Sequence, residues 1–333
     1  MTQSRPDATQ QLPIHDVTPI RSADKAARIL DTIDSYIIYD FISPDISDAL
    51  FYDCLQLPWG TMYHHGGPVP RLVCIQTQPD HAGWTPLYRH PADPDTTSSL
   101  TISQQFSKSV KYISDCIEQL VKHPVNHVLI QQYRTGEDFI SEHADKTVDV
   151  VPNSKIVNFS LGAERRIVFR QKKGRRGHAA TTTTKKEGPV SRMSQKVELK
   201  HGSALVMGLW TNQFWTHAIN PDKRPVADKT EGQKKFDGVR ISLTFRYIGT
   251  FVYPDIQKPL FLYGVGSTSK SRDKPANVVP VDCTDGVGWT QAVELLTAFA
   301  DENRLGAEFD WAASYGNGFD VVEFPPTASR PRA

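Results

Sequence analysis

Three residues in the middle of the chain have the types and spacing of a metal site. His143 and Asp145 are separated by one residue, and His217 follows much later in the sequence. In an extended segment, residues two apart project to the same face, so His143 and Asp145 can take adjacent positions on one ion. Two imidazoles and one carboxylate leave positions open for further ligands, which is the donor set of non-haem iron(II) oxygenases. We therefore predict that these three residues bind Fe(II) and act in catalysis.

The segment 240–246 supplies buried positive charge. Its residues alternate between apolar and polar with the two-residue period of a strand, and Arg240 and Arg246 share the polar face with Ser242 and Thr244. A strand covered on both faces should not bury two guanidinium groups without anions to meet them. A dicarboxylate ligand would supply the anions, because a planar guanidinium can bind both oxygens of a carboxylate. The alternative is an exposed polar face on an ordinary strand. The nearby metal-ligand pattern favours ligand binding.

The elements that must position these residues indicate a mostly β fold. Turn residues separate short segments of period two over 126–248, and many strands without intervening helices indicate an antiparallel sandwich or barrel. A helix, a strand and a second helix are predicted over 24–57, and a helix with one apolar stripe is predicted over 102–121. One short strand is predicted over 72–75, within the loop region before the core, and a further helix is predicted over 290–300. The strands predicted in the core are 128–133, 156–161, 166–170, 195–199, 204–208 and 240–248.

The sequence resembles the AlkB-like iron(II)/2-oxoglutarate dioxygenases. The resemblance rests on H-x-D, a distal His and a terminal R-x-[N/S]-x-T-x-R strand, and it covers roughly 70–248. It implies a double-stranded β-helix (jelly-roll) core with N-terminal helices and a mixed C-terminal extension. It also implies Fe(II) as cofactor, with 2-oxoglutarate and O2 as cosubstrates. Supporting motifs occur in the family order: Pro70-Arg71-Leu72, Leu129-Ile130-Gln131-Gln132-Tyr133, Phe159-Ser160-Leu161-Gly162 and His201-Gly202.

The same resemblance implies which residues bind 2-oxoglutarate. Tyr133 and Arg240 would bind its distal carboxylate, and Arg246 would lie near the metal-side carboxylate. Ser242 belongs to the same cosubstrate-binding face. Gln131 and Ser242 stand where family members often carry Asn, so their hydrogen bonds to 2-oxoglutarate are open.

The chain is expected to divide into four parts. Residues 1–20 are polar and are predicted to be a disordered lead-in, and 21–125 are predicted to form N-terminal helices and a lid or loop region. The dioxygenase core is predicted over 126–250, followed by a C-terminal extension over 251–333. No stretch approaches the roughly 20 apolar residues of a membrane helix, so no membrane association is expected. Four widely scattered cysteines indicate a reducing, cytoplasmic setting, with the nucleus as the alternative.

Two substrate classes remain open, and charge bears on both. The net charge is only +1, but eight basic residues and one acid lie between Arg170 and Arg192. This basic loop, 170–192, could contact nucleic-acid phosphates while a flipped base enters the site, as in oxidative dealkylation by the family. The alternative for the loop is a solvated insertion between two strands. A non-catalytic binding module is disfavoured, because the three ligands and both arginines are present.

The C-terminal extension favours the other class, a small molecule. Its segment 315–324 is similar to the tails of fungal AlkB-like oxygenases, some of which act on amino acids, including valine-to-aziridine chemistry. An aromatic tail folded over the mouth of the site would exclude nucleic acid, and Phe319, Val322 and Phe324 would then contact substrate. Packing on the back of the sheet is the alternative for this tail. We predict oxidation of a small molecule such as an amino acid in secondary metabolism, with nucleic-acid dealkylation as the alternative. The oligomeric state stays open.

Overall fold

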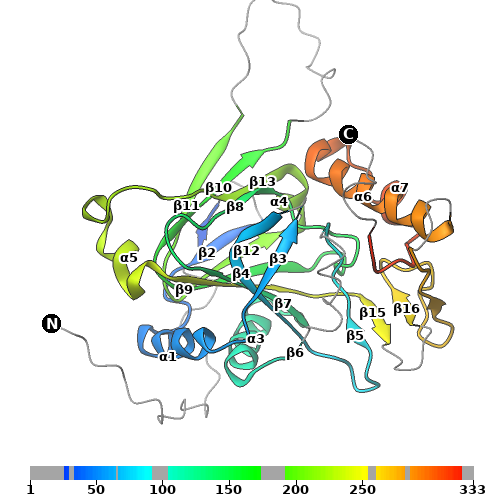
Figure 1. Cartoon of the computed structure of the whole chain (residues 1–333), viewed down its shortest axis with the longest axis horizontal. Coiled ribbons are helices and arrows are strands. Elements are labelled where there is room, and N and C mark those ends of the chain that lie inside the picture. Colours follow the sequence, from blue (N-terminus) through cyan, green and yellow to red (C-terminus); the bar gives the residue numbers. More distant parts are fainter. Residues whose placement is uncertain are drawn as a thin grey trace, which may run out of the picture.

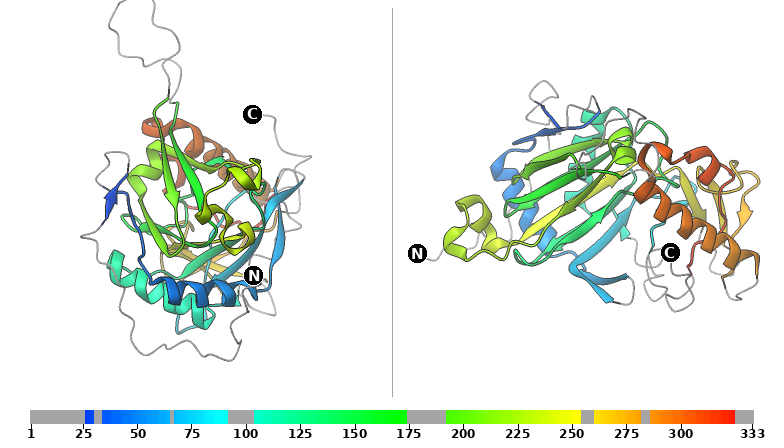
Figure 2. Two further views of the ribbon diagram at one scale, coloured as in Figure 1. Left: turned by 90° about the vertical axis from the view of Figure 1, so that its left-hand side faces the viewer. Right: turned by 90° about the horizontal axis from the view of Figure 1, so that it is seen from above.

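A computed structural model describes residues 26–29, 34–64, 67–91, 104–173, 192–253, 260–281 and 286–324. The predicted lead-in, 1–20, lies outside the described residues, as does most of the basic loop between Lys173 and Arg192. Figures 1 and 2 show a β core with two helices beneath it and a C-terminal extension at one end.

The larger sheet of the core has nine strands among the described residues. In spatial order the strands are β1 (Ala27–Arg28), β2 (Tyr36–Ile38), β12 (Ser203–Gly208), β9 (Lys155–Gly162), β14 (Arg240–Arg246), β7 (His127–Tyr133), β4 (Gly67–Thr77) and β3 (Gly60–His64), with β6 (Gln104–Gln105) beside β4. All of these pairings are antiparallel except that between β4 and β6. The central strand β14 lies between β9 and β7, which puts the two arginines of β14 in the middle of the sheet.

A smaller sheet packs against one face of the larger one. Its order is β11 (Ser194–Leu199), β10 (Arg165–Gln171), β13 (Trp215–Ile219) and β8 (Ile140–His143). Buried apolar side chains from both sheets form one cluster, to which Tyr133 and Met207 belong from one sheet and Phe169 and Ile219 from the other. Two facing antiparallel sheets of this kind form a double-stranded β-helix, or jelly roll.

Two helices cover the other face of the larger sheet: α1 (Pro44–Leu55) and α3 (Lys108–Val121). They pack on Ile241, Leu243 and Phe245, all completely buried, in the largest apolar cluster. The apolar residues of β14 therefore face the helices, and its polar residues face the interior between the two sheets. This is the strand with both faces covered that the sequence pattern predicts.

The C-terminal extension lies beside the core and begins where the last core strand, β14, ends. Its small sheet has the order β17 (Ala276–Asn277), β16 (Phe261–Gly264), β15 (Thr250–Tyr253) and β5 (Thr85–Pro86), so it includes a strand from the N-terminal region. Helices α6 (Val287–Leu305) and α7 (Trp311–Tyr315) follow, drawn in orange and red in Figures 1 and 2. Shorter helices α4 (Leu209–Phe214) and α5 (Glu231–Lys234) connect strands of the core.

Three predictions about the N-terminal region need correction. The first helix expected within 24–57 is contradicted at 27–28, which form β1 and pair with β2. The helix expected from 102 begins at Lys108, where the Ser107 side chain accepts from the backbone N–H of Val110 and caps it. Residues 60–77 are expected to be loop apart from one short strand over 72–75. The structure confirms this strand within the longer β4 and adds β3 beside it. Strand pairing with β7 organises this region, and such long-range pairing has no local sequence signal.

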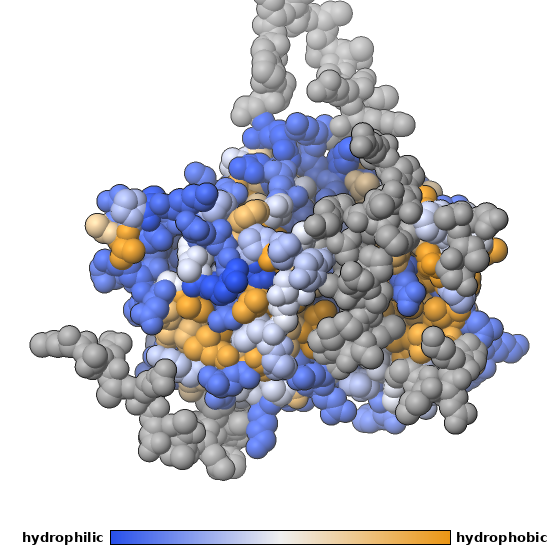
Figure 3. All heavy atoms as spheres, viewed as in Figure 1, coloured by the Kyte–Doolittle hydropathy of each residue, from blue (hydrophilic) through white to orange (hydrophobic). Residues whose placement is uncertain are grey.

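The surface seen in Figure 1 is mixed in character. Hydrophilic side chains border most of this face, and apolar side chains gather in a band below its centre (Figure 3). Among the helices described, none combines the length and apolar character that crossing a membrane requires.

Candidate metal and cosubstrate site

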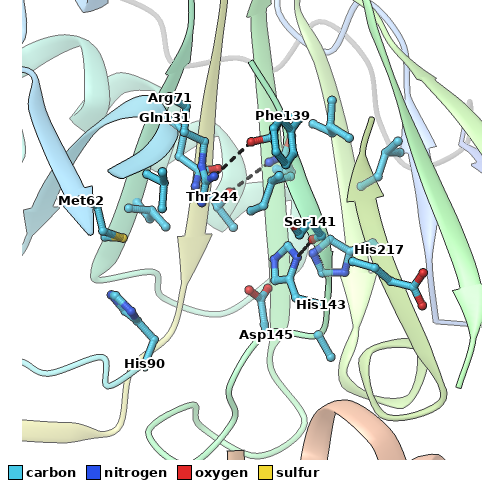
Figure 4. A pocket seen from close by; sticks show the side chains of 18 of the residues that line it. Met62, Arg71, His90, Gln131, Phe139, Ser141, His143, Asp145, His217 and Thr244 are labelled. Atoms are coloured by element: carbon cyan, nitrogen blue, oxygen red, sulfur yellow. Dashed lines mark hydrogen bonds between the residues drawn. The ribbon is translucent and has the colours of Figure 1, made fainter. Parts of the chain in front are cut away.

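The structure brings the three predicted metal ligands together. His143 ends β8 and pairs across the smaller sheet with His217 of β13, and Asp145 follows two residues after His143. One ligand atom from each of the three lies within 4.8 Å of the others. Figure 4 shows the two imidazoles and the carboxylate pointing toward one another. Fe(II) fits this set, because two imidazole nitrogens and one carboxylate oxygen would bind one side of the ion and leave its other positions open.

The protonation states of the three side chains suit a metal. Burial, helped by the neighbouring His217, lowers the pKa of His143 to about 3. Burial also lowers the pKa of His217. Burial opposes ionisation of Asp145, but Arg246 and both imidazoles outweigh it and lower the pKa of that carboxyl to about 2. At neutral pH the site therefore offers two neutral imidazoles and one carboxylate, the forms that bind metal.

A backbone contact orients the first imidazole. His143 Nδ1 lies 2.8 Å from the carbonyl oxygen of Ser141. A hydrogen on Nδ1 would donate to that oxygen and leave the Nε2 lone pair for the metal, the arrangement common among metal-bound histidines.

Arg246 lies at the metal end of β14 and already has an internal partner. Its Nη2 atom is 2.7 Å from Asp145 Oδ1, and both side chains are buried. The guanidinium carbon sits 4.3 Å from the centroid of the Tyr88 ring. Burial works against the charge, but Asp145 raises the pKa of Arg246 above its usual value. The cation therefore keeps the carboxylate ionised and fixes one of its oxygens.

Arg240 lies at the other end of the strand and has no carboxylate partner among the described residues. It is completely buried, and its Nη2 donates to Ser160 Oγ at 2.9 Å and Asn158 Oδ1 at 3.2 Å. Its Nε and Nη1 atoms have no hydrogen-bond partner in the described part of the chain. Burial lowers its pKa to about 10. A buried cation with two unused donors fits an anionic ligand such as the distal carboxylate of 2-oxoglutarate.

The predicted cosubstrate residues around Arg240 are close to it. The Tyr133 ring centroid lies 5.3 Å from the Arg240 guanidinium carbon. Ser242 accepts a hydrogen bond of 2.7 Å from the amide nitrogen of Asn158 on the adjacent strand β9. Family members often carry Asn at the position of Ser242 on β14. In this chain the short Ser242 side chain leaves room for the amide of Asn158, which comes from β9 instead.

A cavity of about 530 Å³ extends from the metal ligands to Tyr133. His143, Asp145, His217, Tyr133 and Arg246 all line it. Arg240 and Ser242 are not among its lining residues, but Tyr133 and Asn158, which contact Arg240, are. Apolar side chains from both sheets, Ile156, Ile167, Leu205 and Met207 among them, form much of its wall. The volume is within the usual range for small-molecule sites.

The structure does not place the predicted substrate residues in this cavity. Phe319 and Phe324 pack in the apolar cluster that α6 forms with its neighbours, and Val322 packs against a second cluster near β15 and β16. None of the three is among the residues that line the cavity. Burying their aromatic and aliphatic area within the extension is the favourable alternative, so the tail acts as a core for the extension.

Many of the residues that line the cavity were not predicted as site residues, and two of them, Arg71 and Asn303, make polar contacts at its wall. Arg71 of β4 is buried and donates through Nη1 to the Phe139 carbonyl at 3.1 Å, while its Nε has no partner among the described residues. Asn303 near the end of α6 also lines the cavity. Arg71 occurs in a motif of the resemblance that implies no role for it, and Asn303 lies 159 positions after Ala144, so the local sequence pattern gives no signal for either.

Comparison with known sequences now identifies the fold and its cofactor. Residues 34–246 match the model of the 2OG-Fe(II) oxygenase superfamily. The chain belongs to this superfamily. It is a 2-oxoglutarate-dependent dioxygenase that uses Fe(II), 2-oxoglutarate and O2, and it is similar in sequence to AlkB homologues.

Curated relatives of this oxygenase include two mammalian DNA demethylases. DNA oxidative demethylase ALKBH2 of Bos taurus is 33% identical over 155 residues, and that of Homo sapiens is 34% identical over 155 residues. The match covers 46% of this chain and 48% and 51% of the two relatives, so the oxygenase spans about half the length of the curated relatives it matches.

Solved structures that resemble this chain have lower sequence identity than the curated relatives. "The structure of OsALKBH1" has a TM-score of 0.41 at 15% identity, covering 67% of this chain and 99% of that chain. A prolyl hydroxylase from Trichoplax adhaerens, in complex with a hypoxia inducible factor oxygen degradation domain peptide, has a TM-score of 0.39 at 10% identity, covering 66% and 85%.

Proposed function

We propose that this oxygenase oxidatively removes alkyl groups from nucleic-acid bases, with His143, Asp145 and His217 holding the iron. Arg240 and Tyr133 would hold the distal carboxylate of 2-oxoglutarate. The observation that carries the cosubstrate assignment is the buried Arg240 guanidinium, which has two unused donors. The substrate class rests on the relatives at 33% and 34% identity, which are DNA oxidative demethylases.

The chemistry needs an oxidant and a correctly held C–H bond. Iron with 2-oxoglutarate and dioxygen supplies the oxidising equivalent when bound, and 2-oxoglutarate leaves as succinate and CO2. One oxygen atom enters succinate, and the other enters the alkyl C–H bond of the substrate. The resulting hemiaminal releases an aldehyde and the free base.

The residues of the chain contribute position and polarity to this reaction. Arg246 holds Asp145 ionised and fixes one of its oxygens. Arg240 adjoins the cavity residues Tyr133 and Asn158, and it would anchor the cosubstrate on that side of the cavity. This contact would set the direction of the cosubstrate relative to the three ligands. The apolar wall would exclude water and favour an uncharged alkyl group near the metal.

A small-molecule substrate, such as an amino acid, is the second candidate, and two observations favour it. Asn303 brings the C-terminal extension to the wall of the cavity. Of the basic residues that flank the loop 170–192, Arg170 and Arg192 both pair with Glu142, at 2.9 and 2.6 Å. Their charge is therefore partly neutralised, which weakens the case for phosphate binding at that position.

Release of succinate from 2-oxoglutarate distinguishes the candidates. The intact chain would be assayed with N-methylated DNA and RNA oligonucleotides, their unmodified counterparts and a set of free amino acids, with His143→Ala as the inactive control. We expect stimulation by methylated oligonucleotides together with loss of the methyl group. Stimulation by an amino acid, with none by any oligonucleotide, would replace the first candidate with the second.

A further inference from the structure

The segment after the first metal ligand is held through its backbone. Four consecutive N–H groups, those of residues 144–147, each donate to a side chain from another element. Two of the acceptors belong to the region matched by the superfamily. Asp145 N–H donates to Asn212 Oδ1 at 2.9 Å, and Lys146 N–H donates to the Tyr88 hydroxyl at 3.1 Å. Asn212 also returns a bond of 2.9 Å from its amide nitrogen to the Asp145 carbonyl.

The other two acceptors come from helix α6 of the C-terminal extension. Ala144 lies between the two metal ligands, and its N–H donates to Asn303 Oδ1 at 2.7 Å. Thr147 N–H donates to Glu302 Oε1 at 3.1 Å, and the Thr147 hydroxyl contacts the same carboxylate. Ala144 and Thr147 are buried, and a buried N–H without an acceptor costs free energy comparable to a lost hydrogen bond. The extension therefore helps to fix the conformation of the ligand segment.

Lysine side chains hold the end of α6 in place. Lys146 Nζ donates to the Phe299 carbonyl at 2.8 Å and to Asn303 Oδ1 at 3.0 Å. Lys172 Nζ donates to the Glu302 carbonyl at 2.6 Å. The Glu302 carbonyl is one of the last four of α6, which lack partners within the helix, and a cation near the end of a helix is favourable. The contacts between α6 and the ligand segment thus run in both directions.

We infer that helix α6 is a structural part of the metal centre, with Asn303 as the residue that positions His143 and Asp145 on the ion. This inference rests on the proposed metal site. Asn303 acts through Ala144, one residue from each ligand, and needs no direct contact with the metal. It lies well beyond residue 246, where the superfamily match ends, so this support is an addition to the family core. Glu302 has the secondary role, because it also accepts from the Tyr315 hydroxyl at 2.8 Å within the extension.

A matched pair of variants on the same helix tests the inference. Asn303→Ala removes the bond to Ala144. Gln291→Ala removes an equivalent bond of 2.7 Å, in which Gln291 Oε1 accepts from the backbone N–H of Asp320 within the extension. Fe(II) affinity would be measured by anaerobic titration of the intact chain without substrate, and thermal unfolding would be recorded in parallel. Asn303→Leu repeats the test with a side chain of similar size.

We expect Asn303→Ala and Asn303→Leu to weaken Fe(II) binding roughly tenfold, as is typical for residues that orient ligands. Gln291→Ala and Asn303→Ala each remove one hydrogen bond of 2.7 Å and should lower thermal stability by similar amounts. Gln291→Ala should nevertheless leave Fe(II) affinity unchanged. Asn303→Asp keeps an oxygen acceptor for Ala144 and Lys146 and should restore most of the affinity. Binding by Asn303→Leu equal to that of Gln291→Ala, with binding lost in His143→Ala, would overturn the inference and leave the metal site intact. Unchanged binding in His143→Ala would overturn the metal site itself.

Discussion

The two ends of strand β14 hold buried arginines in opposite situations. Arg246, at the metal end, is 2.7 Å from Asp145, and its pKa is raised. Arg240, six residues earlier on the same face, has two donor atoms without partners in the described structure, and its pKa is lowered to about 10. The chain supplies the anion at one end and leaves the other end for a ligand. A buried cation thus marks a binding site when no internal carboxylate accompanies it.

The largest effect should follow from removing the internal anion. Asp145→Ala deletes a proposed metal ligand and leaves Arg246 buried without its partner. We expect no detectable 2-oxoglutarate turnover and a loss of about 3–5 kcal/mol in the free energy of unfolding. Chemical denaturation of the metal-free protein checks the second effect. A metal-free variant as stable as the wild type would show that the two arginines are not in different situations.

Substitution at the other end should separate binding from stability. Arg240→Met should raise the KM for 2-oxoglutarate about 100-fold or more, because it removes the proposed anchor for the carboxylate. Without ligand, however, its stability should equal or exceed that of the wild type, since an unpaired buried cation is removed. Initial rates of succinate release and thermal unfolding measure the two effects.

Arg240→Lys is the matched control for that substitution. It keeps the charge and should restore 2-oxoglutarate binding only in part, because the ammonium cannot bind both carboxylate oxygens as a fork. An unchanged KM in both Arg240 variants would rule out the cosubstrate assignment.

Lowering the pH should destabilise the metal-free protein through the two histidines at the metal end of β14. The pKa of His143 is about 3 in the folded protein and the pKa of His217 is also lowered, against about 6.5 in an unfolded chain. The unfolded state therefore binds more protons below pH 6.5, so the stability of the metal-free protein should fall as the pH decreases from 6.5 toward 3. His143 contributes up to about 1.4 kcal/mol per pH unit in that window, and His217 adds to the loss from pH 6.5 down to its own lowered pKa.

Urea denaturation at several pH values measures this loss, and Fe(II) should oppose it at pH 6.5 by binding only the folded state. In His217→Phe the dependence on pH should be shallower. A stability that stays constant between pH 7 and 5 would mean that these imidazoles are not kept neutral by the fold.

The smallest expected effect concerns the neighbour of Arg240. Tyr133→Phe keeps the ring beside the guanidinium and removes one hydroxyl that could donate to the carboxylate of 2-oxoglutarate. We expect the KM for 2-oxoglutarate to rise about fivefold, as for one hydrogen bond of roughly 1 kcal/mol. An effect as large as that of Arg240→Met would transfer the main anchoring role from Arg240 to Tyr133.

Local patterns in the sequence were sufficient for the centre of the fold. The alternation in 240–246 predicts a strand covered on both faces, and the structure puts Leu243 against the helices and Arg246 in the cavity. The H-x-D spacing and the distal His217 likewise anticipate the cluster of three side chains. These features depend on the two-residue period of a strand and on side-chain chemistry, and both can be recognised from the sequence alone.

Contacts between distant segments could not be predicted in the same way. The helix expected over 290–300 is present within α6, but nothing in its sequence indicates that Asn303 accepts a hydrogen bond from Ala144. The prediction that the aromatic tail contacts substrate rests on its likeness to fungal AlkB-like tails and on an aromatic-rich segment folding over the mouth of the site. Large apolar side chains predict burial in a core equally well, and the structure buries Phe319 and Phe324 within the extension.

The hydrogen bond between Asn303 and Ala144 also has a thermodynamic consequence for the whole extension. Coupling between two binding events is reciprocal, so if docking of α6 strengthens Fe(II) binding, Fe(II) must strengthen docking of α6 by the same factor. Local opening of α6 should then be rarer in the iron-loaded enzyme than in the iron-free one, and its amide hydrogens should exchange more slowly. A protease that cleaves the opened helix should therefore cut the extension more slowly in the iron-loaded enzyme than in the iron-free one.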